Sequence, residues 1–387
     1  MVTLRNHLKS AIVKERMDMS KFIPVAVPDL SGNEKKYVMD CMDTSWISSN
    51  GAYIKRFEDA FAEYVGSKHA LSCCNGTVTL HLALLAFGIG PGDEVIVPSL
   101  TYIATANAVR YCNATPALAD CLEDTWNIDP KDIERKITPR TKAIIPVHLY
   151  GNPCDMDSIM AIAKAYNLYV LEDAAECHGA KYNGKMTGAI GDIGTFSFFG
   201  NKIITTGEGG MLVTDNDEFA KKMRILKGQG MDPNRRYWFN EIGYNYRMTN
   251  VEAAIGLAQL ENIDTHIANR KKVAEWYQEE LSSLKDYVDF QQSTVNSENV
   301  WWMFSILLTN KAAISRDELM NKLKEDGIET RPLFYPMHVM PPYFDENACC
   351  PVSEKIASNG INLPTHSSVT REDISFICDR VKKYLIR

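Results

Sequence analysis

Short apolar runs alternate with amphipathic stretches through the first two thirds of the 387-residue sequence, and this alternation limits the fold more than any other feature. It predicts strand–helix–strand units, because a buried parallel strand is a short apolar run and its crossover helix has one apolar face. We therefore expect an α/β fold with a mainly parallel sheet that binds its ligand at the carboxyl ends of the strands. The expected strands are residues 70–74, 94–97, 143–148, 169–172, 195–199 and 211–214, and the expected helices are residues 77–87, 101–111 and 156–166.

The pattern changes after about residue 260, where polar helices and isolated strands replace the regular alternation. The expected elements are a long helix at 264–284, a strand at 301–308, a helix at 316–326 and a last helix at 371–384. This order predicts a separate small α+β domain in the C-terminal part of the chain. The predicted organisation is an N-terminal arm at 1–21, a large domain at 22–262 and a small domain at 263–387.

Charge and hydropathy exclude several classes of function. The net charge of −7 and the pI of about 5.7 argue against a nucleic-acid-binding surface. No apolar run approaches the roughly 20 residues of a membrane span, and no secretory signal precedes the first expected strand, so we expect a soluble, cytoplasmic protein with no membrane partner. The ten cysteines form no C-x-x-C and the eight histidines have no ligand spacing, so we expect reduced thiols and no metal.

Two polar positions follow expected strands where sheets of this kind bind ligands. Asn75, Gly76 and Thr77 form a small-residue turn into a helix, and backbone N–H groups at a helix start can hold a phosphate. An ordinary capped helix explains the same residues. Asp173 ends the apolar run at 169–172 and is either a catalytic carboxylate or the cap of the next segment. The residues alone leave both pairs of alternatives open.

Lys202 lies in a segment rich in glycine and phenylalanine, between the last two expected strands of the first domain. Glycines allow close approach of the backbone there, and a lysine that is removed from water can lose its charge and become a nucleophile. A solvated turn lysine is the commoner case for any single lysine. The density of glycine and aromatic residues around Lys202 favours the nucleophile.

Seven stretches in register resemble the DegT/DnrJ/EryC1/StrS family of sugar aminotransferases, from about residue 22 to the C-terminus. They are TSWISS at 44–49, NGT at 75–77 with LHLAL at 80–84, PSLTY at 98–102, EDAAE at 172–176, the segment 196–210, GYNYRMT at 243–249, and RP at 331–332 with YPMH at 335–338. The resemblance implies the aspartate-aminotransferase-like fold, known as fold type I, and a homodimer with shared active sites. It also implies pyridoxal 5′-phosphate (PLP) as the cofactor.

By matched position, the resemblance assigns catalytic roles to Lys202 and Asp173 and cofactor-binding roles to Tyr102 and Glu176. Lys202 would hold PLP as a Schiff base and, once freed by the donor, would move a proton between donor and cofactor. Asp173 would pair with the pyridine nitrogen and keep it protonated, which PLP requires to act as an electron sink. Tyr102 would stack on the ring, and Glu176 would lie near the ring hydroxyl, where many members of the family have Gln. Lysine rather than histidine at position 202 implies transamination rather than dehydration.

The resemblance further implies a phosphate site and a substrate site. The phosphate would be held by Gly76, Thr77 and Ser197, together with Asn245 from the partner subunit. The candidate substrate contacts are His338, Arg235, Arg236 and Arg331. Arg235 and Arg236 are suited to a phosphate or a carboxylate, although a surface loop at the dimer interface explains them equally well.

The implied reaction moves the amino group of L-glutamate to a keto sugar that is free or linked to a nucleotide. The closest likeness suggests GDP-4-keto-6-deoxymannose as the acceptor and GDP-perosamine as the product, for surface polysaccharide such as the O-antigen of lipopolysaccharide. The same chemistry on another keto sugar is an alternative, for example formation of 8-amino-3,8-dideoxy-manno-octulosonate from its 8-oxo precursor. A PLP-binding protein without catalysis is a third reading, which the presence of both Lys202 and Asp173 disfavours.

Overall fold

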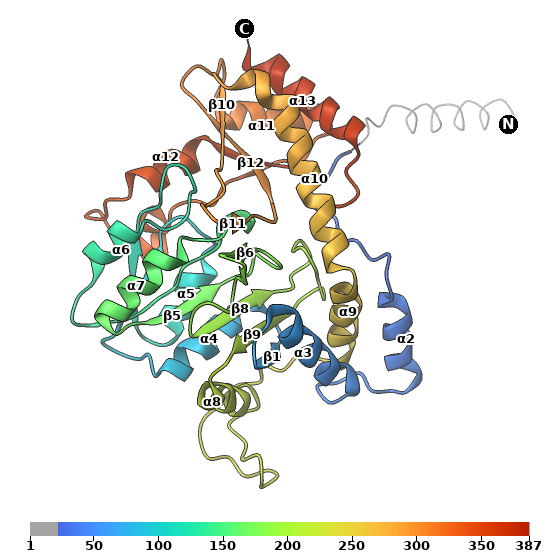
Figure 1. The fold of residues 1–387 in the computed structure, drawn as a ribbon, viewed down its shortest axis with the longest axis vertical. Coiled ribbons are helices and arrows are strands. Elements are labelled where there is room, and N and C mark those ends of the chain that lie inside the picture. The colour runs from blue at the N-terminus through green and yellow to red at the C-terminus, as the bar shows by residue number, and fades with distance from the viewer. Residues whose placement is uncertain (1–21, 387) are drawn as a thin grey trace, which may run out of the picture.

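The computed structural model describes residues 22–386, so the arm expected at 1–21 lies outside the described residues. A seven-stranded sheet forms the centre of the molecule (Figure 1). Its strands are β1 (His69–Cys73), β2 (Glu94–Pro98), β3 (Thr115–Ala119), β4 (Thr141–Ile144), β5 (Tyr169–Asp173), β8 (Ile193–Ser197) and β9 (Gly210–Thr214). Their order is β1-β9-β8-β5-β4-β2-β3, and only β9 runs antiparallel to its neighbours. The expected α/β fold with a mainly parallel sheet is confirmed.

Both faces of this sheet are buried, as the continuous apolar strands require. Val95 and Val97 pack into one core cluster with residues of α4, α5 and α8, whereas Ile96 between them packs into another with residues of α6 and α7. Side chains alternate across a strand, so neighbouring positions reach opposite faces. The helices of this part are α2 (Glu34–Asp43), α3 (Ala52–Val65), α4 (Gly76–Phe87), α5 (Ala104–Tyr111), α6 (Pro130–Lys136), α7 (Met156–Tyr166), α8 (Asp217–Lys227) and α9 (Asn250–Glu261).

The C-terminal part contains an antiparallel four-stranded sheet in the order β10-β12-β14-β13. Figure 1 shows the long helix α10 leading from α9 to this sheet, with α11 and α13 beside it. The elements are α10 (Ile263–Leu281), β10 (Val288–Phe290), β12 (Phe304–Leu308), α11 (Arg316–Glu325), β13 (Arg331–Pro332), α12 (Pro351–Asn359), β14 (Gly360–Leu363) and α13 (Arg371–Leu385). Asn262 separates α9 from α10, and the domain limits at 22–262 and 263–387 stay a prediction.

The remaining elements are short. Three two-residue strands pair in the order β11-β6-β7. They are β6 (Lys181–Tyr182), β7 (Lys185–Met186) and β11 (Ser297–Glu298), and the short 3-10 helices are η1 (Leu149–Gly151), η2 (Ser282–Leu284), η3 (Met337–Val339) and η4 (Pro341–Tyr343). No helix within residues 22–386 is long and apolar enough to cross a bilayer. All ten cysteines are free in the structure.

Several expected elements have different limits in the structure, and two of the shifts have a local reason. The strand expected at 143–148 ends at Ile144, because Pro146 has no N–H to continue the ladder. The strand expected at 301–308 begins at Phe304, since Trp301 adopts a left-handed backbone with φ 51°. The helix expected at 101–111 begins at Ala104.

Candidate active site

Lys202 lies in the loop that joins β8 to β9. The loop folds back on itself, because the N–H of Phe198 donates to the carbonyl of Gly209 and the N–H of Lys202 donates to that of Phe199. Only 10% of the Lys202 side chain is exposed, and its Nζ lies 3.6 Å from Oε1 of Glu176. Burial lowers the pKa of Lys202, while the carboxylates of Glu176 and Asp173 act in the opposite direction. The structure thus has the buried lysine that the glycine-rich segment favoured.

Asp173 is the last residue of β5, and 5% of it is exposed. Its Oδ2 accepts a hydrogen bond from the Thr105 hydroxyl at 2.8 Å, and its Oδ1 accepts one from the Ala175 N–H at 3.2 Å. Burial raises the pKa of Asp173, and these two hydrogen bonds and Lys202 partly offset that effect. A buried carboxylate of this kind gains strongly from a cationic partner such as a protonated ring nitrogen.

Glu176 follows Asp173 by three residues and is equally buried. Its Oε2 accepts the backbone N–H of Tyr150 at 2.9 Å, which leaves Oε1 facing Lys202. Burial raises the pKa of Glu176, and the ammonium of Lys202 lowers it again. Lys202, Asp173 and Glu176 therefore form one buried, charge-coupled group at the carboxyl ends of β5 and β8.

Gly76, Thr77 and Ser197 meet where α4 begins beside the end of β8. A Cβ on Gly76 would lie 2.8 Å from Cβ of Ser197, so only glycine permits this approach. The Asn75 side chain caps the helix by accepting the Val78 N–H at 3.0 Å. The first amides of α4, those of Gly76 and Thr77, have no intrahelical acceptor. The capped helix and the phosphate cradle, which the residues alone left as alternatives, are compatible here.

Tyr102 lies between β2 and α5, three residues before the Thr105 that binds Asp173. Its side chain is 60% exposed, and its ring centroid is 5.8 Å from that of Phe334. The position of Tyr102 beside the anchored start of α5 agrees with the expected stacking role, which stays a prediction.

Asn245, Arg235 and Arg236 come from one segment, whose end at Tyr246 accepts the N–H of Cys74 just before the Gly76 turn. They belong to the segment 228–246 after α8, where Met231 pairs with Phe239 and Gly228 pairs with Asn245. Arg235 lies 3.9 Å from the ring centroid of Trp238, and Arg236 lies 4.9 Å from that of Tyr237. In the described part of the chain, no hydrogen bond joins Asn245 to the Gly76 cradle. The expected role of Asn245 involves a second subunit, and the roles of all three residues stay predictions.

His338 and Arg331 already have partners in the structure. His338 is buried, with Nδ1 2.7 Å from the Ser99 hydroxyl and Nε2 3.1 Å from Glu354. Arg331 lies in β13, and its Nη2 is 3.7 Å from Oε1 of Glu329. Both ring nitrogens of His338 are engaged, so a contact of His338 with a sugar would need one of these partners to move.

Most of the chain matches known aminotransferases. Residues 28–382 match the model of the DegT/DnrJ/EryC1/StrS aminotransferase family. The chain belongs to this family. The GDP-perosamine synthase of Caulobacter vibrioides is 55% identical over 94% of this chain and 98% of its own length, and that of Escherichia coli O157:H7 is 50% identical over 94% and 99%. The solved structure of DesV from S. venezuelae superposes with a TM-score of 0.87 at 33% identity, over 92% of this chain and 95% of DesV.

Membership of the DegT/DnrJ/EryC1/StrS family makes the protein a PLP-dependent sugar aminotransferase with the fold-type-I architecture. The residues present fit PLP: a buried carboxylate for the ring nitrogen, a buried lysine for the aldehyde carbon, and a glycine cradle at a helix start for the phosphate. When bound, PLP withdraws electrons from the carbon that carries the amino group. Asp173, Lys202 and the Gly76 cradle would hold it.

Sequence reasoning missed several residues that support this family's site. Thr105 and the fully buried Tyr150 hold the two carboxylates, and the ring of Trp302 lies beside Lys202. His178 is also buried, and burial together with Lys202 and Arg270 lowers its pKa to about 3, so it is neutral. The EDAAE motif at 172–176 ends two residues before His178, but no local pattern indicated Tyr150 or Trp302.

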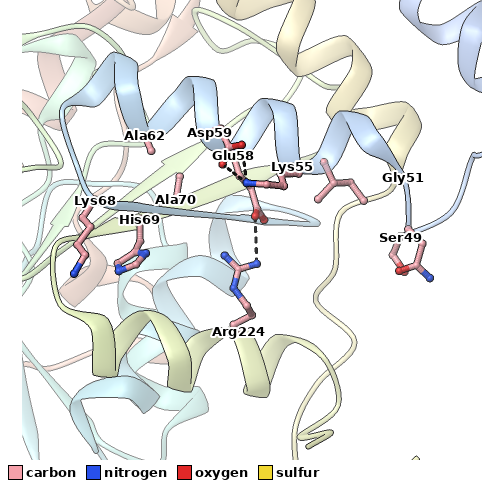
Figure 2. Close-up of a pocket in the computed structure, with 12 residues that line it drawn as sticks. Ser49, Gly51, Lys55, Glu58, Asp59, Ala62, Lys68, His69, Ala70 and Arg224 are labelled. Carbon is pink, nitrogen blue, oxygen red and sulfur yellow. Dashed lines mark hydrogen bonds and ion pairs between the residues drawn. The ribbon is translucent and has the colours of Figure 1, made fainter. Parts of the chain in front are cut away.

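A separate cavity of about 450 Å³ lies between α3, β1 and α8 (Figure 2). Figure 2 shows Glu58 pointing from α3 toward Arg224, at 3.3 Å, and Lys55 paired with Asp59 along the same helix. Lys68, at the rim, pairs with Asp217. The cavity includes none of the PLP-binding residues, and these cations already have acidic partners, so we assign it no ligand.

Proposed function

We propose that this protein transfers the amino group of L-glutamate to GDP-4-keto-6-deoxymannose and so forms GDP-perosamine. The observation that carries the proposal is the 55% and 50% identity, over nearly the full length of both chains, to two relatives named GDP-perosamine synthase. The family match at residues 28–382 spans the segments that contain Lys202, Asp173 and the Gly76 cradle. We place the reaction in the cytoplasm and in the supply of sugars for surface polysaccharide such as lipopolysaccharide.

The buried residues have distinct tasks in this reaction. Asp173 keeps a proton on the ring nitrogen, which its burial between Thr105 and Ala175 favours once a cation is present. Lys202, when it is a free amine, takes the proton from the α-carbon of glutamate and delivers it to the cofactor carbon. In the second half of the reaction, Lys202 moves the proton in the opposite direction. The keto carbon of the sugar then receives both the amino group and the proton. Glu176 keeps the amine of Lys202 in place between these steps.

We also propose a homodimer with shared active sites. The segment 228–246 exposes Tyr237, Trp238, Phe239 and Ile242, the last of them 90% exposed. Apolar side chains that project together from one loop favour burial against another protein surface. A second copy is the partner that brings Asn245 to the phosphate cradle and Arg235 and Arg236 toward the substrate.

An absorbance spectrum of the purified protein with PLP tests the chemistry. A visible band that is absent in Lys202→Ala and disappears when L-glutamate is added is expected. No band in the wild-type protein would refute the aminotransferase assignment. A screen of GDP-4-keto-6-deoxymannose against other keto sugars, including the 8-oxo octulosonate, then tests the acceptor. Turnover of another sugar alone would refute the perosamine assignment and leave the chemistry intact.

Mixing two inactive variants tests the shared site. Lys202→Ala lacks the lysine, and Asn245→Asp places a negative charge beside the phosphate. If Asn245 acts across the interface, a mixed dimer contains one site with both native residues, and the mixture regains activity. If both residues act within one chain, the mixture stays inactive. Sedimentation of each variant as a dimer is the control.

A further inference from the structure

Trp302 contacts Lys202 in two ways. Nζ of Lys202 lies 3.9 Å from the centroid of the Trp302 ring, and the indole Nε1–H donates to the carbonyl of Asn201 at 2.8 Å. Trp302 is 4% exposed, so both contacts are shielded from water. One side chain therefore holds the backbone before Lys202 and offers an electron-rich face to its amine.

The backbone around Trp302 is built to place this ring. Trp301 has a left-handed φ of 51°, and its N–H donates to Oδ1 of Asn299 at 2.8 Å. Gly151 has φ +99°, and a Cβ on it would lie 2.7 Å from the backbone nitrogen of Trp302. The ring of Tyr150 stacks against that of Trp302 with centroids 6.2 Å apart. The segment is thus pressed against η1, which also supplies the N–H that binds Glu176.

Arg270 on α10 holds the same segment from the other side. It is 3% exposed, and its Nη1 donates to the carbonyls of Trp302 at 2.9 Å and Thr365 at 2.6 Å. Among residues 22–386, no carboxylate pairs with Arg270, and burial lowers its pKa to about 10. Burying a cation without a carboxylate partner is energetically unfavourable, so the hydrogen bonds to the two carbonyls hold the guanidinium of Arg270 in place.

Several charged and aromatic groups face the Lys202 amine, and the indole ring of Trp302 is one of them. Glu176 and Asp173 face Lys202 from β5 and the turn after it, and His178 faces it as a neutral side chain. Oε1 of Glu176 lies 3.6 Å from the amine, and the Trp302 face lies within contact distance as well. An ammonium is attracted to an indole face most strongly where water is excluded.

We propose that Trp302 is a positioning residue that holds the ε-amino group of Lys202 beside Glu176 whenever the lysine is not bonded to PLP, and that Arg270 anchors Trp302 for this task. The proposal rests on the assignment of Lys202 as the cofactor lysine, which belongs to the proposed function. It adds a residue from the C-terminal part of the chain to a site otherwise built at the carboxyl ends of β5 and β8.

The rate at which PLP binds covalently to the cofactor-free protein tests this role, because only the neutral amine attacks. The visible band is followed over time at a series of pH values, in wild type, Trp302→Phe and Trp302→Leu. Removing a group that stabilises the ammonium lowers the pKa of Lys202. At pH values below the midpoint of the wild-type rate profile, Trp302→Leu should therefore bind PLP about tenfold faster. Trp302→Phe should bind it about threefold faster, since a phenylalanine ring attracts an ammonium more weakly than an indole does.

Trp276→Leu is the matched control, because Trp276 lies on α10 and packs against the C-terminal core away from Lys202. It should lower stability without moving the midpoint of the pH profile. A Trp302 series with lowered stability and an unchanged midpoint would overturn the proposal and leave Trp302 a core residue. If Trp302→Leu does not fold, an unchanged pH midpoint in Trp302→Phe would likewise overturn the proposal. The assay contains no sugar, so its result does not depend on whether GDP-4-keto-6-deoxymannose is the acceptor. Failure of the wild-type protein to form the visible band would instead refute the proposed function.

Discussion

The hydroxyl of Thr105 donates a 2.8 Å hydrogen bond to Oδ2 of Asp173, and this bond joins the first turn of α5 to the end of β5. Thr105 is 1% exposed and lies three residues after Tyr102. One short segment after β2 therefore places the candidate stacking ring and orients the carboxylate expected to bind the ring nitrogen. The bond also favours the ionised form of Asp173, whose pKa burial raises.

Thr105→Val should weaken PLP binding and lower kcat, each by about tenfold, since a hydrogen bond to a charged group contributes about 1.5–3 kcal/mol. With one hydrogen bond fewer, the pKa of Asp173 rises further, and PLP binding is lost at a higher pH as the solution is acidified. Titration of the visible band against PLP over a range of pH measures both effects. Thr105→Ser restores the hydroxyl and should recover wild-type behaviour; equal PLP affinity in all three proteins would contradict the role.

Gly76→Ala should raise the Kd for PLP by about tenfold or more. The added Cβ would lie 2.8 Å from Cβ of Ser197 and force α4 and β8 apart at the phosphate cradle, and overpacking of this kind costs about 1–3 kcal/mol. Gly90→Ala is the matched control, because a Cβ there meets nothing within 4 Å. Equal affinities of the two variants, measured by absorbance titration, would refute the cradle.

Glu176→Gln should leave the visible band in place and speed its formation at acidic pH by about tenfold. The carboxylate of Glu176 raises the pKa of Lys202, so its removal leaves more neutral amine at a given pH. Glutamine keeps an oxygen that can accept the Tyr150 N–H. A variant whose formation rate follows the wild-type pH profile would show that Glu176 does not act on the charge of Lys202.

Glu58 forms a buried ion cluster that ties α3 to β1 and α8. Its Oε1 accepts from the N–H and hydroxyl of Ser72 at 2.8 and 2.9 Å, and from Nζ of Lys227 at 3.1 Å. Arg224 lies at Oε2, at 3.3 Å. Burial alone would raise the pKa of Glu58, but the two cations and Ser72 outweigh it and the pKa is lowered.

Glu58→Gln should lower the free energy of unfolding by about 3 kcal/mol at neutral pH, because it leaves Lys227 buried without its acid. The folded pKa of Glu58 lies below the usual 4.5, so its contribution is complete above that value and is lost as pH falls through the lowered pKa. The difference between wild type and variant in urea unfolding should therefore shrink below about pH 4. The double variant Glu58→Gln, Lys227→Met should recover part of the loss; a constant difference at all pH values would contradict the ionic origin.

The alternation of apolar runs and helices predicted most of the central sheet, since a strand and its crossover helix are read from neighbouring residues. The same local reading located Lys202, Asp173 and the turn at Gly76, each at the end of a strand or in the loop that follows it. It failed at Pro146, whose missing N–H interrupts the ladder before Val147 pairs again with Asp173, and at Trp301, whose left-handed backbone precedes the start of β12. It gave no indication of β13 or β14, short strands whose pairing partners lie elsewhere in the chain.

By itself, the sequence determined the fold class and the family, and it predicted the residues expected to carry the chemistry, because these depend on periodicity and on motifs a few residues long. Only the tertiary structure decided which residues surround them: Thr105 lies 68 positions from Asp173, and the Trp302 ring that contacts Lys202 comes from the C-terminal part of the chain. Such contacts have no local signal, since close packing between distant segments forms them and many apolar residues would satisfy the same pattern.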